Sequence, residues 1–251
     1  MTFFYRSLYY QLGWTTILYI IPCVFFAVLC HEYFKAKTAE KLGCLCDKAA
    51  YKNPLKYIYP VGFLCAAWTG YGWGKEQDVD LSKLFDWKNR SLIWNVIRYS
   101  VSGSLANILV AIVALVVQAI TFICMLYASV ELNGFWDSFH LAINILVWTQ
   151  IFMAITQLMP LPGLLIPKLI AYGAISRNIT DTKRNNSLRL VQDIIFKVHK
   201  YSKFIIILFI MSGLLYYVCE LPACFVFEWL YTGMEKLVDF ITGGLFTQAG
   251  W

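Results

Sequence analysis

Charged side chains are scarce in this sequence. They make up 14% of the 251 residues, whereas 59% of the residues are hydrophobic and the mean hydropathy is +0.60. A soluble domain carries about 25% charged residues. The stretch from Ser100 to Val130 contains 31 residues without one charged side chain, more than the roughly 20 that a membrane-spanning helix needs. The sequence therefore excludes a soluble globular fold and predicts an integral membrane protein.

Four long apolar runs are the candidates for membrane spans. A fifth run, Tyr57 to Trp73, has 17 residues rich in glycine and aromatics, which is marginal for a span. We expect it to form a re-entrant or interfacial hairpin, covered by protein or facing a wet cavity. The predicted fold class is all-α, a polytopic helical membrane protein with about four transmembrane helices plus the hairpin at 57–73. The four runs are Trp14–Cys30, Ser100–Val130, Phe139–Ile166 and Phe204–Val218.

Basic residues are distributed unevenly and predict the orientation. Eleven Lys or Arg and six Asp or Glu lie from Lys35 to Arg98, and seven basic residues against two acidic ones lie from Arg177 to Lys203. The connection at 128–138 has no basic residue. By the positive-inside rule, residues 35–56 and 177–203 face the cytoplasm. We expect three parts: a membrane core at 1–176, a basic cytoplasmic loop at 177–203, and a C-terminal transmembrane segment and tail at 204–251.

The sequence does not support several other kinds of function or structure. No basic face interleaved with stacking aromatics is present, so nucleic acid is not an expected partner. Six of the eight cysteines lie in or beside apolar segments, where cysteine behaves as a small hydrophobe. Cys44 and Cys46 have a spacing that could hold a soft metal, but no second pair accompanies them. We therefore expect neither a disulfide framework nor a thiolate metal centre.

The first candidate functional site follows the first apolar run, at His31-Glu32 and Lys35. Polar residues at membrane depth are functional candidates by default. In a zinc protease, the motif H-E-x-x-H places two imidazoles on one helix face, with the glutamate as general base. Here Lys35 occupies the position of the second histidine, and its protonated amine has no lone pair with which to bind a metal. The alternative interpretation is a helix end whose polar residues reach the headgroups.

Five fragments in order resemble the site-2 protease family of intramembrane zinc proteases, in its short bacterial form. Residues 31–36 and 39–43 resemble its active-site helix, and Asn-Pro-Leu-Lys-Tyr-Ile-Tyr-Pro-Val-Gly at 53–62 is similar to its Asn-Pro-Leu-Lys-His-Ile-Asp-Pro-Ile-Gly. Gly-Trp-Gly-Lys at 72–75 resembles Gly-Trp-Ala-Lys, and Ser-Gly-Ser-Leu-Ala-Asn at 102–107 resembles Ala-Gly-Pro-x-x-Asn. Gln-Leu-Met-Pro-Leu-Pro-Gly-Leu-Leu at 157–165 aligns with Asn-Leu-Ile-Pro-Ile-Pro-Pro-Leu-Asp. The resemblance covers residues 25–172.

The resemblance implies a helical membrane core with a buried zinc site near the cytoplasm that hydrolyses peptide bonds in transmembrane helices. It also implies three zinc ligands, of which only His31 is retained, because the other two positions are Lys35 and Leu165. Catalytic zinc normally has three protein ligands. Glu32 occupies the position of the general base. Without the metal, however, it has no metal-bound water to deprotonate. The remaining marks are Asn107, retained, and three altered positions: Gln157, Tyr59 for aspartate and Ser104 for proline.

We therefore expect a catalytically inactive pseudoprotease of the bacterial cytoplasmic membrane, surrounded by lipid and binding a transmembrane helix of another protein. No cofactor is expected. Lys35 can supply the positive charge that Glu32 would lose with the metal. The alternatives are an active intramembrane zinc protease, with zinc as cofactor, and a small transport component. A metal site rebuilt from Cys30, Cys65 or His140 stays open as part of the first alternative.

Overall fold

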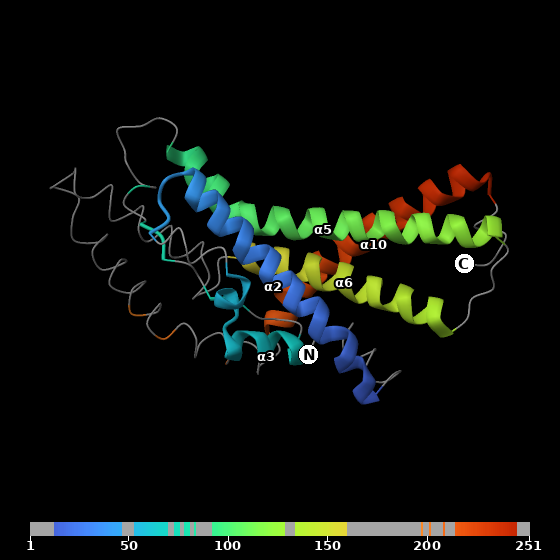
Figure 1. Ribbon diagram of the computed structural model, residues 1–251, viewed down its shortest axis with the longest axis horizontal. Helices are drawn as coiled ribbons and strands as arrows, with labels where there is room; N and C mark the ends of the chain where they lie inside the picture. The colour runs from blue at the N-terminus through green and yellow to red at the C-terminus, as the bar shows by residue number, and fades with distance from the viewer. Residues whose placement is uncertain are drawn as a thin grey trace.

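Three long apolar helices form the centre of the protein, in a computed structural model (Figure 1). They are α2 (Thr16–Lys41), α5 (Leu92–Ala128) and α6 (Gly134–Leu158), and they pack against one another. By length and composition, the helical stretches Gly13–Lys41, Trp94–Ala128 and Gly134–Leu158 could each cross a membrane. The structure describes residues 13–46, 53–69, 73–75, 78–80, 83, 92–128, 134–159, 197, 201, 208 and 214–244.

This architecture confirms an all-α fold with several membrane-spanning candidates. The expected fourth run, 204–218, lies mostly outside the described residues. Its end enters α10 (Leu214–Thr242), which packs on α5 and α6. Among the described helices, α10 is not one of the three candidate spans. Four carboxylates at positions 220, 228, 235 and 239 lower its apolar character.

Helix α2 is longer than the apolar run predicts. The run stops at Cys30, but the helix continues for eleven residues to Lys41. Its end is set by Gly43, whose φ of 72° lies in the left-handed region. The amides of Gly43 and Cys44 donate to the carbonyls of Glu40 and Ala39, both at 3.0 Å, which is the Schellman pattern of a helix C-terminus. His31 therefore lies inside the helix, and the alternative interpretation of a helix end at His31-Glu32 is wrong.

The segment at 57–73 turns back on itself. A short 3-10 turn, η3 (Pro54–Tyr57), leads into α3 (Pro60–Thr69), which has only 10 residues and a length of about 15 Å. The Lys75 amide then donates to the Tyr57 carbonyl at 2.7 Å. The Cα of Gly62 packs so closely on the Trp73 carbonyl that a Cβ could not fit there. The two ends of the segment therefore meet, as a hairpin requires.

The apolar core lies where α2, α5, α6 and α10 meet. Aliphatic and aromatic side chains fill it, and Trp148 and Phe152 of α6 stack with their ring centroids 6.0 Å apart. The Trp148 ring also meets Phe227 of α10 edge to face, at 5.6 Å. Because no side chain of α6 from Val147 to Ala154 is exposed, this helix is the central one. Fully buried members of the core include Ile20, Val24, Ala111, Ile145, Ile151 and Val238.

Candidate functional site

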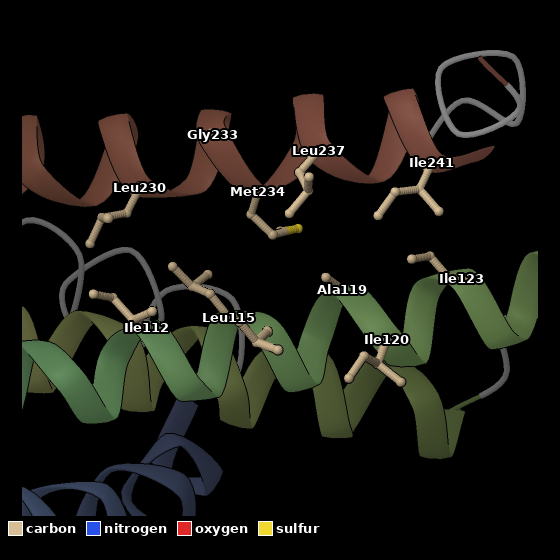
Figure 2. A pocket seen from close by; sticks show the side chains of 11 residues that line it. Ile112, Leu115, Ala119, Ile120, Ile123, Leu230, Gly233, Met234, Leu237 and Ile241 are labelled. Atoms are coloured by element: carbon tan, nitrogen blue, oxygen red, sulfur yellow. The ribbon is translucent and has the colours of Figure 1, made fainter. Parts of the chain in front are cut away.

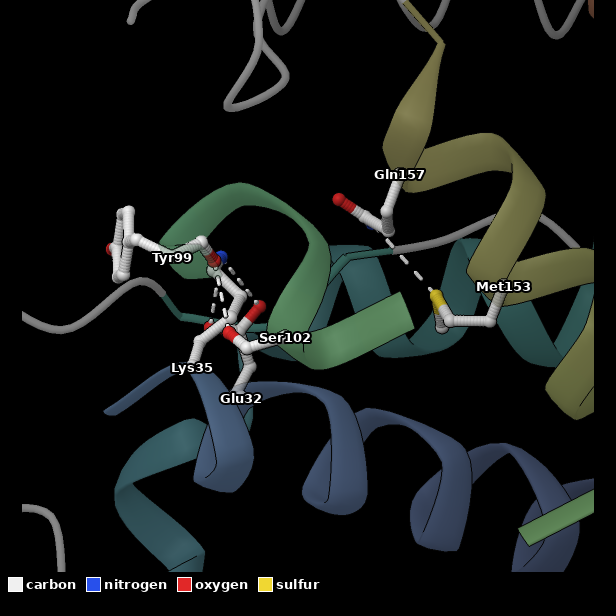
Figure 3. Close-up of polar contacts among 6 residues, drawn as sticks. All are labelled: Glu32, Lys35, Tyr99, Ser102, Met153 and Gln157. Atoms are coloured by element: carbon white, nitrogen blue, oxygen red, sulfur yellow. Dashed lines mark hydrogen bonds and ion pairs between the residues drawn. The ribbon is translucent and has the colours of Figure 1, made fainter. Parts of the chain in front are cut away.

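His31, Glu32 and Lys35 are buried together in the interior of α2. Their exposed fractions are 3%, 2% and 3%. The Lys35 ammonium lies 3.3 Å from one oxygen of the Glu32 carboxylate and 3.5 Å from the other. Residues three apart on a helix lie on the same face, and the expected proximity of Lys35 to Glu32 is confirmed. Figure 3 shows the pair beside the first turns of α5.

Gly103 of α5 places its backbone against the His31 ring. A Cβ built on Gly103 would lie 2.7 to 2.8 Å from three atoms of the imidazole. Nearby, the Ser102 hydroxyl donates to the Tyr99 carbonyl at 2.9 Å, which is drawn next to Lys35 in Figure 3. Only a residue without a side chain allows α2 and α5 to approach this closely.

A second glycine covers Glu32 from another side. A Cβ on Gly74 would lie 2.5 Å from the Glu32 Cγ and 3.0 Å from the Tyr57 carbonyl oxygen. Tyr57 is buried, and the Tyr59 and Trp73 rings stack with their centroids 6.3 Å apart. The loop after α3 therefore closes over the carboxylate and shields the ion pair from solvent.

The structure thus brings four of the five family-like fragments to one place. The fragments at 53–62, 72–75 and 102–107 all contact the helix that carries His31 and Glu32, directly or through Tyr57. The fifth fragment is described only at its start, residues 157–159. Leu165 lies outside the described residues. The sequence did not predict that the glycines at 62, 74 and 103 are the points where these fragments pack closely on one another. Each of the three glycines nevertheless belongs to one of the quoted motifs.

Several buried polar atoms at this site lack a hydrogen-bond partner within the described part of the chain. They are His31 Nδ1, the Ser104 hydroxyl and both amide atoms of Asn107, whose exposed fraction is 0%. An unsatisfied polar group in an apolar interior costs roughly 1–3 kcal/mol. Native interiors rarely leave such groups unpaired, so we expect their partners to be water, a ligand or residues outside the described part of the chain.

Gln157 lies at the end of α6, on the other side of the view in Figure 3. Its amide nitrogen lies 3.8 Å from the Met153 sulfur, and the side chain is buried. Gln157 therefore keeps the amide group of the asparagine that the resemblance places at this position.

The residues at this site do not fit a zinc ion. At the three ligand positions that the resemblance implies, His31 carries an imidazole, Lys35 an ammonium engaged by Glu32, and Leu165 an alkyl chain. Among the described residues, no group of three His, Cys, Asp or Glu side chains could hold a metal ion.

His140 cannot complete a rebuilt metal site at His31. Its ring stacks on Phe122 of α5, with 4.1 Å between centroids. Phe122 lies 19 residues beyond Gly103, which contacts His31, and this separation corresponds to about 28 Å along a helix. Cys30 and Cys65 are only partly buried. The alternative of a rebuilt site that combines His31 with His140 is therefore ruled out by this separation.

A second polar cluster lies between α5 and α6, away from Glu32 and Lys35. The Gln118 amide donates to the Asn144 side-chain oxygen at 3.1 Å, joining α5 to α6. Sequence reasoning missed this cluster. The available signal was Gln118, an amide in the middle of an uncharged run, where polar residues are functional candidates.

The Gly103 contact gives a direct test of the site geometry. We expect Gly103→Ala to lower the free energy of unfolding by about 1–3 kcal/mol, as overpacking does in a tight core. His31→Ala in the same chain should remove the clash and recover part of the loss. Gly233→Ala is the matched control, because nothing lies within 4 Å of its Cβ position. Thermal melts in detergent measure all three; equal effects at positions 103 and 233 would contradict the close approach.

Comparison with protein-family models, curated proteins and solved structures finds no match to this chain.

Proposed function

We propose that this protein is a zinc-free pseudoprotease of site-2 protease type that binds a transmembrane segment of a partner protein. The buried Glu32–Lys35 ion pair is the observation that carries the proposal. In the family that the sequence resembles, the residue at the position of Lys35 is a metal ligand. Here its ammonium supplies the positive charge next to the former general base, so the carboxylate stays compensated at depth without a metal.

The unpaired polar atoms support the binding part of the proposal. His31 Nδ1, the Ser104 hydroxyl and the Asn107 amide offer donors and acceptors that have no partner within the described part of the chain. A regular transmembrane helix satisfies its own backbone groups. A partner segment that unwinds locally exposes amides and carbonyls, and these side chains could pair with them. The proposed function is therefore capture of a transmembrane segment, without hydrolysis, in the groove that a protease would use for its substrate.

A photocrosslinking experiment tests this function. Tyr59 is replaced by p-benzoylphenylalanine, a change from one aromatic side chain to another next to the loop over Glu32. Val113, which is exposed and lies ten residues beyond Gly103 on α5, is the control position. We expect a discrete adduct with an intact single-span protein from position 59 and not from position 113. A partner recovered as fragments cut within its span would instead support the active protease.

We also propose four membrane crossings, the hairpin at 57–73 entering and leaving from the cytoplasmic side, and a bacterial cytoplasmic membrane. In Figure 2 α10 runs in the same direction as α5, because its numbering rises from Leu230 to Ile241 as that of α5 rises from Ile112 to Ile123. With 177–203 in the cytoplasm, this direction is the one that a fourth crossing needs.

Cysteine labelling in intact cells tests the orientation. In a chain whose only cysteine is Cys46, which is exposed, an impermeant maleimide should react only after the membrane is permeabilised. Asp137→Cys at the start of α6, in the cysteine-free chain, should react in intact cells. Cys44 should react more slowly than Cys46, because burial raises the pKa of its thiol and only the thiolate is a nucleophile. Labelling of Cys46 in intact cells would reverse the topology.

The transport alternative has one observation in its favour. Buried amides and an imidazole recur along α5 and α6, at Asn107, Gln118, His140 and Gln150, and intramembrane polar residues often mark substrate or ion pathways. Uptake or release of a tracer by proteoliposomes that lack any partner would favour transport over binding.

A further inference from the structure

Two cysteines follow the end of α2, on the side that we place in the cytoplasm. Cys44 is fully buried, and its thiol donates to the Ala39 carbonyl at 3.2 Å. The amide of the same residue donates to that carbonyl at 3.0 Å. Cys46, two residues later, is exposed. One thiol thus helps to cap the helix that carries Glu32 and Lys35, and the other is accessible from outside the fold.

An antiparallel backbone pairing holds both cysteines in an extended conformation. Leu45 pairs with Val79, and the amides of residues 46 and 80 donate to the carbonyls of residues 78 and 44, at 3.1 and 2.8 Å. Alternate residues of an extended segment point to the same side, so Cys44 and Cys46 share one face. Their Cα atoms are two residue steps apart, about 6.6 Å, which is at the upper end of the roughly 4.4–6.8 Å that a disulfide spans. A disulfide can therefore form, and it would shorten the extended segment.

The two thiols differ in reactivity. Burial is the main cause that raises the pKa of the Cys44 thiol, and the neighbouring Asp80 and Cys46 raise it further. Because Cys46 contributes to this shift, the two thiols lie within electrostatic reach of each other. Only a thiolate attacks an oxidant, and it must be accessible to do so. Cys46 should therefore react first, with Cys44 placed beside it to react second.

We propose that Cys44 and Cys46 form a reversible redox pair that responds to hydrogen peroxide in the cytoplasm. The Cys46 thiolate attacks one oxygen of the peroxide; the O–O bond breaks, a sulfenic acid forms, and the other oxygen takes up a proton and leaves as water. The Cys44 thiol then loses its proton, its sulfur attacks the Cys46 sulfur, and the S–O bond breaks with release of a second water. Two thiols and one peroxide thus give one disulfide and two waters. Disulfides in the cytosol are typically transient and redox-sensing.

The disulfide would act on the Glu32–Lys35 site through the chain on either side of it. Oxidation removes the Cys44 S–H that donates to α2, and shortening of 44–46 weakens its hydrogen bonds to 78–80. Gly74, five residues before Val79, packs on Glu32. Strained or exposed disulfides are the labile, regulatory ones. The redox pair therefore controls how tightly the segment 73–80 covers the ion pair, whether or not a partner segment binds there.

Peptide mass spectrometry of the purified full chain tests the proposal. Trypsin cleaves after Lys41 and Lys48, so the peptide 42–48 contains both cysteines. When the reduced protein is treated with an equimolar amount of hydrogen peroxide, this peptide should lose the mass of two hydrogen atoms, and dithiothreitol should restore it. Cys44→Ser should instead leave a sulfenic acid on Cys46 that dimedone traps. Cys46→Ser should give neither product. Cys124, also exposed but within the uncharged stretch 100–130, should stay reduced.

Hydrogen exchange of the unmodified protein tests the link to the site. After oxidation, the amides in 39–46 and 73–80 should exchange on the order of tenfold faster, because lost hydrogen bonds favour local opening, while 147–154 in the core should not change. Two results would overturn the proposal. One is a 42–48 peptide that stays reduced, or that carries oxygen on single cysteines without a disulfide. The other is a disulfide that leaves exchange in 39–46 and 73–80 unchanged.

Discussion

Replacing Lys35 with methionine should destabilise the protein by about 3–5 kcal/mol, the usual loss when one partner of a buried ion pair is removed. Methionine keeps most of the length of the lysine side chain and removes its charge. The Glu32 carboxylate would then remain at 2% exposure without its counter-ion, and would have to bind a proton or admit water. Thermal unfolding in detergent, compared with the unmodified protein, measures the loss.

The double variant Glu32→Gln with Lys35→Met should recover much of this loss, because both charges are then absent. Lys83→Met is the matched control. Lys83 forms a pair with Asp80 at 3.7 Å, also three residues apart, but its side chain is 60% exposed, and exposed pairs contribute about 0–1 kcal/mol. A double-mutant cycle isolates the coupling. Effects of the Glu32 and Lys35 changes that add within about 0.5 kcal/mol would show that the two charges do not depend on each other.

Restoring two ligands should restore zinc binding, from well under one to about one ion per chain. The change is Lys35→His together with Leu165→Asp, at the two ligand positions that the family resemblance implies. His31 and a histidine at position 35 would lie one turn apart on one face of α2, and His31 Nδ1 has no partner among the described residues. The removal of Lys35 also frees Glu32 from its ion pair.

Two controls make the zinc result specific. Lys35→His alone should bind zinc weakly, because catalytic zinc normally requires three protein ligands. Adding His31→Ala to the double variant should abolish binding. Elemental analysis of protein purified without chelators measures the content. A double variant that folds but takes up no zinc would show that the scaffold around α2 no longer has the geometry of a metal site.

The helices were predictable because their signal is simple. A run such as Ser100–Val130, with no charged residue, is too long and too apolar for any element other than a buried or membrane-spanning helix. The ion pair was predictable for a similar reason, since positions 32 and 35 share a helix face whatever the tertiary structure. Both inferences depend on local geometry alone.

The parts that could not be predicted depend on tertiary contacts. The close approach of Gly103 to His31, the Gly74 contact with Glu32 and the Gln118–Asn144 hydrogen bond join residues far apart in the sequence. Composition carries no information on which glycine meets which neighbour. The full length of α2 was missed because charged residues from Lys35 to Lys41 end an apolar run without ending a helix; Lys, Ala and Glu are good helix formers.

The zinc content of the unmodified protein tests the central claim most directly. Protein purified without chelators, and again after incubation with excess zinc and desalting, is analysed for metal per chain. If Lys35 has replaced a ligand and neutralises Glu32, both samples should contain well under one zinc per chain. About one zinc per chain, lost in His31→Ala, would contradict the pseudoprotease and restore the active metalloprotease as the function of this protein.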